Sequence, residues 1–350
     1  MFGLIYTTIA ATLVAIILVV ALRPMAIALR LVDTPNERKH HSGEVPLIGG
    51  PVIWLIVTFA SIFSPAGFPW SIALAGAALV ALGMLDDRRP LSPWLRLAFH
   101  LAIAIVLVFS QNLALHDIGF ANALFNTPDL NWMHTILAIL AIIIAINAFN
   151  FIDGIDGLSA SMGLMAITHL NWVFNLLNIA QSPLVLFNSV VFIGALIGFL
   201  LFNLQVFNGR KIFLGDSGSM YIGMSVAIAL LSSSQTSYTD RAAIPAALCL
   251  WIIAIPLTDM TTIIVRRILN KRSPMAPDRT HLHHILMQAG FSARRTLLVM
   301  ILSSMGAFWI GCALFHYFGE IVSIICFFAF MAIYYWAVQK SRYFVGALND

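Results

Sequence analysis

Acidic residues interrupt long apolar segments of this sequence at a few points, and these points are its first indication of chemistry. The most conspicuous is NAFNFIDGIDGLSA (147–160), in which Asp153 and Asp156 lie between two apolar stretches. A purely structural connection would need no paired acids. Gly154 and Gly157 favour a turn whose backbone can approach a ligand closely. We therefore expect a functional site at this boundary.

Three further carboxylates have a similar setting. Asp86 and Asp87 are adjacent at the end of an apolar stretch and are followed at once by Arg88 and Arg89. Asp216 lies in FLGDSGS, where a turn between glycines opens the next apolar stretch. Carboxylate oxygens suit Mg²⁺ or Mn²⁺, which also bind substrate phosphates. Backbone amides at such a helix N-terminus attract phosphate, so this carboxylate and a phosphate can share a cation.

A histidine-rich segment near the C-terminal third carries most of the remaining polar chemistry. SPMAPDRTHLHH contains one acid, one arginine and three histidines: Asp278, Arg279, His281, His283 and His284. Arginine and histidine donors fit the binding and polarising of a pyrophosphate. A zinc site is the less favoured alternative, because the segment has no cysteine and no helical His-Glu-x-x-His pattern.

The glycine and acid patterns exclude two familiar sites. The acids of 147–160 do not alternate and no glutamate closes the loop, so this is not a calcium loop of the EF-hand type. In FLGDSGS the nearest lysine, Lys211, precedes the glycines and no Gly-Lys-Ser/Thr follows. An ATPase P-loop is therefore not indicated.

The composition excludes a water-soluble protein. Of 350 residues, 60% are hydrophobic and 10% are charged, and the mean hydropathy is +0.92. Helices satisfy their own backbone hydrogen bonds in lipid, so we predict an all-α, polytopic membrane bundle that forms one domain over residues 1–350. Eleven spans are predicted, at 3–22, 47–64, 70–85, 95–110, 134–149, 159–179, 186–204, 218–234, 243–265, 296–316 and 321–339.

The distribution of basic residues predicts the orientation of this bundle. With the first loop in the cytoplasm, every lysine and arginine except Arg241 falls on the cytoplasmic side. The N-terminus is then periplasmic, the C-terminus is cytoplasmic, and all the acidic and histidine-rich segments share one cytoplasmic face. This topology explains the net charge of +4, and no nucleic-acid partner is expected.

A few residues inside the apolar stretches deserve separate interpretation. His100 and His169 are expected to be packed and hydrogen-bonded, whereas Asp259 could reach the inner face and support the site. GALIG (194–198) has glycines at the spacing of close helix contacts, which we assign to packing inside the bundle. A homodimer stays open as an alternative use of such a face.

Taken together, the motifs resemble a known family. LDDR, NAFNFIDGIDGL, FLGDSGS and SPMAPDRTHLHH are similar, in order and spacing, to the motifs of polyprenyl-phosphate N-acetylhexosamine-1-phosphate transferases. RLVDTPNERKHHSGEVPLIGG and WIIAIPLTDM extend the resemblance over nearly the whole chain. The histidine motif reads HLHH, as in the branch that uses GlcNAc, and lacks the three consecutive histidines typical of the muramoyl-pentapeptide branch.

This resemblance implies an activity and a set of ligands. The expected reaction transfers GlcNAc-1-phosphate from UDP-GlcNAc to undecaprenyl phosphate and releases UMP, with Mg²⁺ or Mn²⁺ as cofactor. The expected location is the bacterial inner membrane, among membrane lipid, in surface polysaccharide synthesis such as that of O antigen or a common surface antigen. Another UDP-N-acetylhexosamine or UDP-MurNAc-pentapeptide remains an alternative donor.

The resemblance also implies roles for individual residues. The acids matching Asp86 and Asp87 lie at the metal and the lipid phosphate, and the one matching Asp216 is a metal ligand. Asp153 and Asp156 belong to the nucleotide-sugar site, and His281 and His283 engage phosphates. Whether an aspartate acts as general base is left open. The remaining substrate-binding residues expected on these motifs are Lys39, Asn150, Arg266, Asp278, Arg279 and His284.

A transporter of an anionic or lipid-linked precursor is the alternative from another functional class. Transporters usually place ionisable residues and broken helices near the middle of the membrane. In this sequence the acids crowd one predicted interface, which favours the enzyme.

Overall fold

The computed structural model describes residues 2–33, 43–64, 67–115, 131–181, 183–207, 209–234, 243–275 and 280–349. Helices make up nearly all of this part: α1 (Phe2–Ala28), α2 (Gly49–Ser61), α3 (Trp70–Arg88), α4 (Pro93–Ser110), α6 (Asn131–Ile152), α7 (Leu158–Leu176), α8 (Pro183–Asn203), α9 (Gly215–Ser233), α10 (Ala246–Ile252), α11 (Ala254–Leu269), α12 (Leu282–Gln288) and α13 (Ala293–Asn349). Strands β1 (Val32–Asp33) and β2 (Val45–Pro46) pair antiparallel, with Val32 opposite Pro46.

Each predicted span falls on helix. The stretch 243–265 is divided into α10 and α11, which meet at an angle of 79°. The last two predicted spans are the two parts of α13, which are separated at Gly319, where φ is 81°. By length and apolar composition, six of the described helices qualify to cross a membrane, or seven if α10 and α11 form one span. The all-helical membrane architecture is thus confirmed, and the number of eleven crossings stays a prediction.

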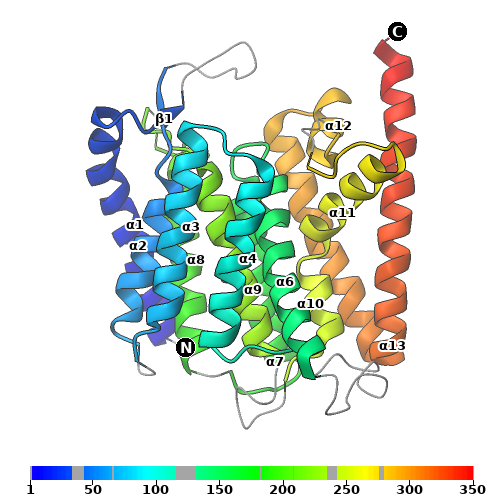
Figure 1. Ribbon diagram of the computed structural model, residues 1–350, viewed down its shortest axis with the longest axis horizontal. Helices are drawn as coiled ribbons and strands as arrows, with labels where there is room; N and C mark the ends of the chain where they lie inside the picture. The colour runs from blue at the N-terminus through cyan, green and yellow to red at the C-terminus, as the bar shows by residue number, and fades with distance from the viewer. Residues whose placement is uncertain are drawn as a thin grey trace.

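The two ends of the described chain lie at opposite ends of the bundle (Figure 1). The β1–β2 hairpin, α12 and the C-terminal end are together at the top of this view, and the N-terminus is at the bottom. That the termini lie on opposite sides of a membrane stays a prediction. Which side is cytoplasmic stays a prediction from the basic residues.

Helix α9 lies inside the bundle and is covered by α2, α3, α6 and α7. Its sequence, GDSGSMYIGMSVAIALLSS, distributes glycine and serine around the helix, so neighbouring helices can approach it closely. Most of its residues are buried. The first turn of α9 carries Asp216, so this packing determines where that carboxylate lies.

Two glycines bring α2 and α3 against the first turn of α9. A Cβ atom at Gly83 would lie 2.3 Å from the backbone N and Cα of Ser217, and one at Gly50 would lie 2.5 Å from the Ser217 Oγ. Next to this contact, the Phe213 amide donates to the Pro46 carbonyl (2.8 Å) and the Gly49 amide donates to the Phe213 carbonyl (3.0 Å). The segment before α2 and the segment before α9 are therefore joined backbone to backbone.

The packing expected for residues inside the helices is confirmed. Cβ positions at Gly194 and Gly198 lie 2.7 and 2.3 Å from the Cβ atoms of Ala11 and Ala15, so GALIG packs α8 against α1 within the bundle. His100 is buried and its Nδ1 is 3.3 Å from Asn147 Nδ2. The buried ring of His169 stacks on Phe308, with centroids 4.1 Å apart.

Candidate active site

A cavity of about 560 Å³ opens among the polar segments that the sequence singles out. Its walls come from the β1–β2 hairpin, the end of α3, the 153–157 turn, the end of α8, the segment 211–216, and the residues around α12. Five predicted site residues line it: Asp87, Asp153, Asp156, Asp216 and His284. The fold thus brings together residues that are far apart in the sequence.

The adjacent acids at the end of α3 have different surroundings. Asp87 lines the cavity, and its Oδ1 accepts a hydrogen bond from the Asp216 amide in the first turn of α9 (3.0 Å). This contact places a negative charge at a helix N-terminus, where the helix dipole favours it. Asp86 is buried, and its two oxygens accept from the Leu91 amide (2.6 Å) and from Arg96 (2.7 Å).

Arg96 lies between the carboxylates of Asp86 and Asp216. The same guanidinium nitrogen that binds Asp86 lies 3.9 Å from an oxygen of Asp216. Arg96 follows Ser92, which caps α4 by accepting from the Leu95 amide (3.2 Å), so α4 begins beside the site. We did not predict Arg96 as a site residue. A single arginine one helical turn beyond a cap carries no distinctive sequence signal.

Asp216 lies between α6 and α3. Its Oδ1 accepts from Asn150 Nδ2 (2.8 Å), and this amide also reaches Ser219 Oγ (3.1 Å). The side chain keeps 35% of its surface open, toward the cavity that it lines. Desolvation by the surrounding protein, followed by the charge of Asp87, raises the pKa of Asp216 to about 7. Asp216 precedes the predicted span that starts at residue 218. Asn150 is not among the described residues that line the cavity, and its role is to hold the Asp216 carboxylate.

The turn between α6 and α7 contributes the other two acids. Burial, followed by the charges of Asp216, Asp87 and Asp156, raises the pKa of Asp153 well above its usual range. Gly157 adopts a left-handed conformation (φ 76°) at the start of α7, which a side chain would strain. Its position explains why this turn contains glycine.

Asp156 forms the shortest described ion pair of the cavity. Lys211 Nζ lies 2.6 Å from Asp156 Oδ2, and it also lies 4.7 Å from the centroid of the Phe213 ring. Lys211 was not predicted as a site residue. Its place two residues before FLGDSGS was the available signal, because a cation next to a phosphate-binding turn is a common arrangement.

The three histidines form a compact group behind the cavity wall. The ring centroids of His281 and His283 are 5.4 Å apart, and those of His283 and His284 are 4.2 Å apart. His283 packs on Gly154, where an added Cβ would lie 1.9 Å from its Nε2. Burial, with smaller contributions from the neighbouring histidines, lowers the pKa of His283 to about 3, so this ring is neutral. Of the three, His284 lines the cavity itself.

Other predicted residues have different outcomes. Arg266 is buried in α11 and is not among the described residues that line the cavity. Its neighbour Arg267 donates to the Pro274 carbonyl and lies 5.6 Å from the Phe151 ring centroid. Lys39, Asp278 and Arg279 lie outside the described residues, so their roles stay predictions.

The carboxylates of the cavity fit a divalent cation. Asp87, Asp153, Asp156 and Asp216 line one cavity together with Lys211, and burial, followed by the neighbouring carboxylates, raises the pKa values of Asp153 and Asp216. In the part of the chain that the structure describes, no three histidine, cysteine or acidic side chains converge closely enough to form a protein-only metal cage. Mg²⁺ typically uses one or two carboxylates together with water and substrate phosphates, so this donor set suits it.

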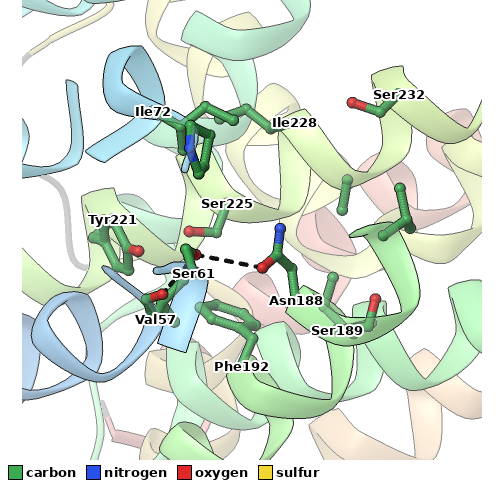
Figure 2. A pocket seen from close by; sticks show the side chains of 14 residues that line it. Val57, Ser61, Ile72, Asn188, Ser189, Phe192, Tyr221, Ser225, Ile228 and Ser232 are labelled. Atoms are coloured by element: carbon green, nitrogen blue, oxygen red, sulfur yellow. Dashed lines mark hydrogen bonds between the residues drawn. The ribbon is translucent and has the colours of Figure 1, made fainter. Parts of the chain in front are cut away.

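A second cavity, of about 100 Å³, lies toward the other ends of α2 and α9 (Figure 2). Hydroxyl and amide groups line it together with apolar side chains, and Ser61 Oγ donates to Asn188 Oδ1 at 3.4 Å. Its described lining contains no lysine, arginine, aspartate or glutamate. This second cavity therefore offers no charged side chain to an anionic ligand.

Known proteins are similar to this chain over most of its length. The profile of the family described as "Glycosyl transferase family 4" matches residues 69–234. An undecaprenyl-phosphate alpha-N-acetylglucosaminyl 1-phosphate transferase from Haemophilus influenzae is 33% identical over 93% of this chain and 92% of that protein. Proteins of the same name from Escherichia coli (strain K12) and Pasteurella multocida are 32% and 38% identical, over 91% and 80% of this chain and 86% and 77% of those proteins.

These similarities confirm the resemblance that the motifs carry. The matched profile includes the acids at 86–87, the 153–157 turn and Asp216, which the structure gathers around one cavity. The chain therefore belongs to glycosyl transferase family 4, among the polyprenyl-phosphate N-acetylhexosamine-1-phosphate transferases.

Proposed function

We propose that this protein transfers GlcNAc-1-phosphate from UDP-GlcNAc to undecaprenyl phosphate, which yields undecaprenyl-diphospho-GlcNAc and UMP. The observation that carries the proposal is the single cavity lined by Asp87, Asp153, Asp156 and Asp216 at one end of a membrane helix bundle. The names of the similar proteins support the same donor group and the same acceptor.

The nucleotide sugar is assigned to the side of the cavity formed by the 153–157 turn. Asp156 and Lys211 are held together there, and Phe213 offers an aromatic face beside the lysine. The histidine group lies against the same turn through the contact of His283 with Gly154. These groups orient the donor so that its pyrophosphate lies near the carboxylates.

The reaction itself is a phosphoryl transfer. An oxygen of the lipid phosphate attacks the phosphorus that carries GlcNAc, the bond from this phosphorus to the oxygen of UMP breaks, and UMP leaves with the electron pair. Such reactions depend on in-line positioning and on neutralisation of charge. The second pKa of a phosphate monoester is about 6, so the attacking group is mostly dianionic at pH 7 and needs no general base.

Asp216 and Asp87 would hold Mg²⁺ or Mn²⁺, because both line the cavity and meet at the first turn of α9. When bound, the ion supplies neutralisation of the negative charge that develops on the pyrophosphate oxygens. Asp86 was predicted as a ligand as well. Since its oxygens are engaged by Leu91 and Arg96, we assign it to positioning the end of α3.

We place the cavity on the cytoplasmic face of the bacterial inner membrane. The basic residues of the sequence support this orientation, and it gives a cytosolic nucleotide sugar and a lipid phosphate access to one site. The product would enter surface polysaccharide synthesis.

The proposed reaction is tested with the purified protein in lipid nanodiscs that contain undecaprenyl phosphate. We expect UMP and GlcNAc-bearing lipid in equal amounts, loss of both on chelation with EDTA, and recovery with Mg²⁺ or Mn²⁺. UDP-GlcNAc should react at least about 10-fold faster than UDP-GalNAc or UDP-MurNAc-pentapeptide, the factor for one well-placed contact. Accumulation of labelled substrate in proteoliposomes without any product would support the transporter instead.

Lys211→Met should raise the KM for UDP-GlcNAc about 10-fold and leave kcat within about 3-fold. The substitution removes the charge that Asp156 binds at 2.6 Å but keeps a side chain of similar length. A 10-fold change corresponds to one charge-assisted hydrogen bond. Initial rates over a range of UDP-GlcNAc concentrations measure the effect, with the exposed neighbour Arg210→Met as matched control. An equal effect of both variants would contradict a specific role for Lys211.

A further inference from the structure

Asp259 receives three hydrogen bonds from two other segments of the chain. Its Oδ2 lies 2.7 Å from His281 Nδ1, and its Oδ1 accepts from the Leu282 amide (3.0 Å) and from the Tyr334 hydroxyl (2.9 Å). Asp259 is in α11, His281 and Leu282 begin α12, and Tyr334 is in the second part of α13. One carboxylate thus ties two elements to α11.

This carboxylate is shielded from solvent. Asp259 is 2% exposed, His281 is 7% exposed and Tyr334 is 9% exposed. A buried carboxylate is costly unless its hydrogen bonds are satisfied, and here both oxygens have donors. If this position served packing alone, an apolar side chain of similar volume would give the fold equal stability.

The contact determines which nitrogen of His281 is available to a ligand. Because a carboxylate only accepts hydrogen bonds, His281 Nδ1 must carry a proton and donate to Asp259. The remaining ring nitrogen, Nε2, is then the one that can meet a substrate group. Carboxylate partners of this kind fix the tautomer and the ring orientation of histidines in other sites.

The same carboxylate also positions the start of α12. The Leu282 amide is one of the first-turn donors that a helix leaves without an internal partner, and Asp259 accepts from it. Tyr334 packs with Ile285 of α12 in a small apolar cluster. The histidine motif is therefore attached to α11 and α13 at its first residue.

We propose that Asp259 is the positioning residue of His281, and that Tyr334 holds Asp259 in place for this purpose. The proposal rests on the proposed function, in which the histidine group that contains His281 orients the donor. Asp259 acts through His281; neither residue is among the described residues that line the cavity, which this histidine group reaches through His284. Asp259 lies outside the four motifs, in the WIIAIPLTDM segment that extends the family resemblance.

Asp259→Asn separates positioning from packing. The asparagine oxygen can still accept from Leu282 and Tyr334, so the start of α12 and the melting temperature should be retained. Its amide nitrogen, however, donates to His281 Nδ1 and forces the proton onto Nε2. We expect kcat for UMP release to fall about 10- to 100-fold, the range for partners of site histidines, while the KM for UDP-GlcNAc stays within about 3-fold.

A double-mutant cycle tests whether Asp259 acts through His281. In an His281→Ala background, Asp259→Asn should cause no further loss of kcat. Tyr334→Phe should lower kcat less than Asp259→Asn does, and Tyr335→Phe, the same change one residue later, serves as its control. Wild-type kcat in Asp259→Asn, or the same fold-loss with and without His281, would overturn the proposal.

A spectroscopic measurement keeps this test independent of the proposed reaction. In ¹⁵N-histidine NMR of the full-length protein in nanodiscs, the His281 signal, assigned by its loss in His281→Ala, should show a protonated Nδ1. In Asp259→Asn it should change to the tautomer protonated at Nε2. An unchanged His281 signal would overturn the positioning role even if UMP release is observed, and the expected change would support it even if the donor proves to be different.

Discussion

Asp216→Asn is expected to lower UMP release by at least about 10²- to 10³-fold, the range for removing a group that stabilises charge in a transition state. The carboxylate opens into the cavity, beside the Asp87 carboxylate that caps its own amide. Asparagine keeps an oxygen for Asn150, which donates at 2.8 Å in the wild type, so the local packing is preserved. The substitution therefore removes a charge that a divalent cation requires. Steady-state UMP release at saturating substrates, repeated over a titration of Mg²⁺, measures the effect.

Glu320→Gln is the matched control for this prediction. It makes the same change from carboxylate to amide at the break in α13, where Glu320 Oε1 accepts from the Ala247 amide at 3.5 Å. Glutamine retains an oxygen for this contact, so activity should stay within about 2-fold. If Asp216→Asn turned over near the wild-type rate at every Mg²⁺ concentration, Asp216 would not be a ligand of the metal.

Gly83→Ala is expected to lower the free energy of unfolding by about 3 kcal/mol, the upper part of the range for overpacked interiors, and to reduce activity strongly. An added Cβ would lie 2.3 Å from backbone atoms of Ser217, which cannot rotate away as a side chain would. Helix α3 must then move away from α9. This movement also separates Asp87 from the Asp216 amide that it now accepts from at 3.0 Å. Thermal melting of the detergent-solubilised protein and UMP release report the two effects.

Gly306→Ala provides the comparison. Gly306 lies within α13, and a Cβ there would meet nothing within 4 Å. Alanine is favoured over glycine in helices by roughly 0.5–1 kcal/mol, so this variant should melt at or slightly above the wild-type temperature. If both alanine variants melted alike, close contact at Gly83 would not explain how α3 is placed against α9.

The site is a product of helix packing rather than of any one motif. Asp87 and Asp216 are 129 residues apart in sequence and meet because glycines let α2 and α3 approach the first turn of α9. The VPLIGG segment pairs with Phe213, just before α9, through backbone hydrogen bonds of Pro46 and Gly49. This segment resembles part of a family motif, but the sequence alone assigned it no contact. Motif spacing identifies which residues belong to a site, and packing sets the distances between them.

The sequence by itself determined the helical membrane architecture and singled out the acids that line the cavity. Apolar runs are long enough to be recognised without any partner, because lipid requires each helix to satisfy its own backbone, so the positions of the spans were predictable. The acids and histidines were predictable as well, since charged side chains between such runs need a functional reason. The two-helix division of 243–265 was not predicted, because the bend depends on neighbours and leaves the hydropathy unchanged.

Only the tertiary structure decided what each side chain does. Adjacent residues of a helix point in different directions, so Asp86 turns to Arg96 while Asp87 turns to α9, and their spacing in sequence cannot separate these roles. The pairs Lys211 with Asp156 and His281 with Asp259 join segments 55 and 22 residues apart. Such contacts depend on how the helices pack and on which rotamer each side chain adopts. The hydrophobic periodicity of the sequence predicts neither of these.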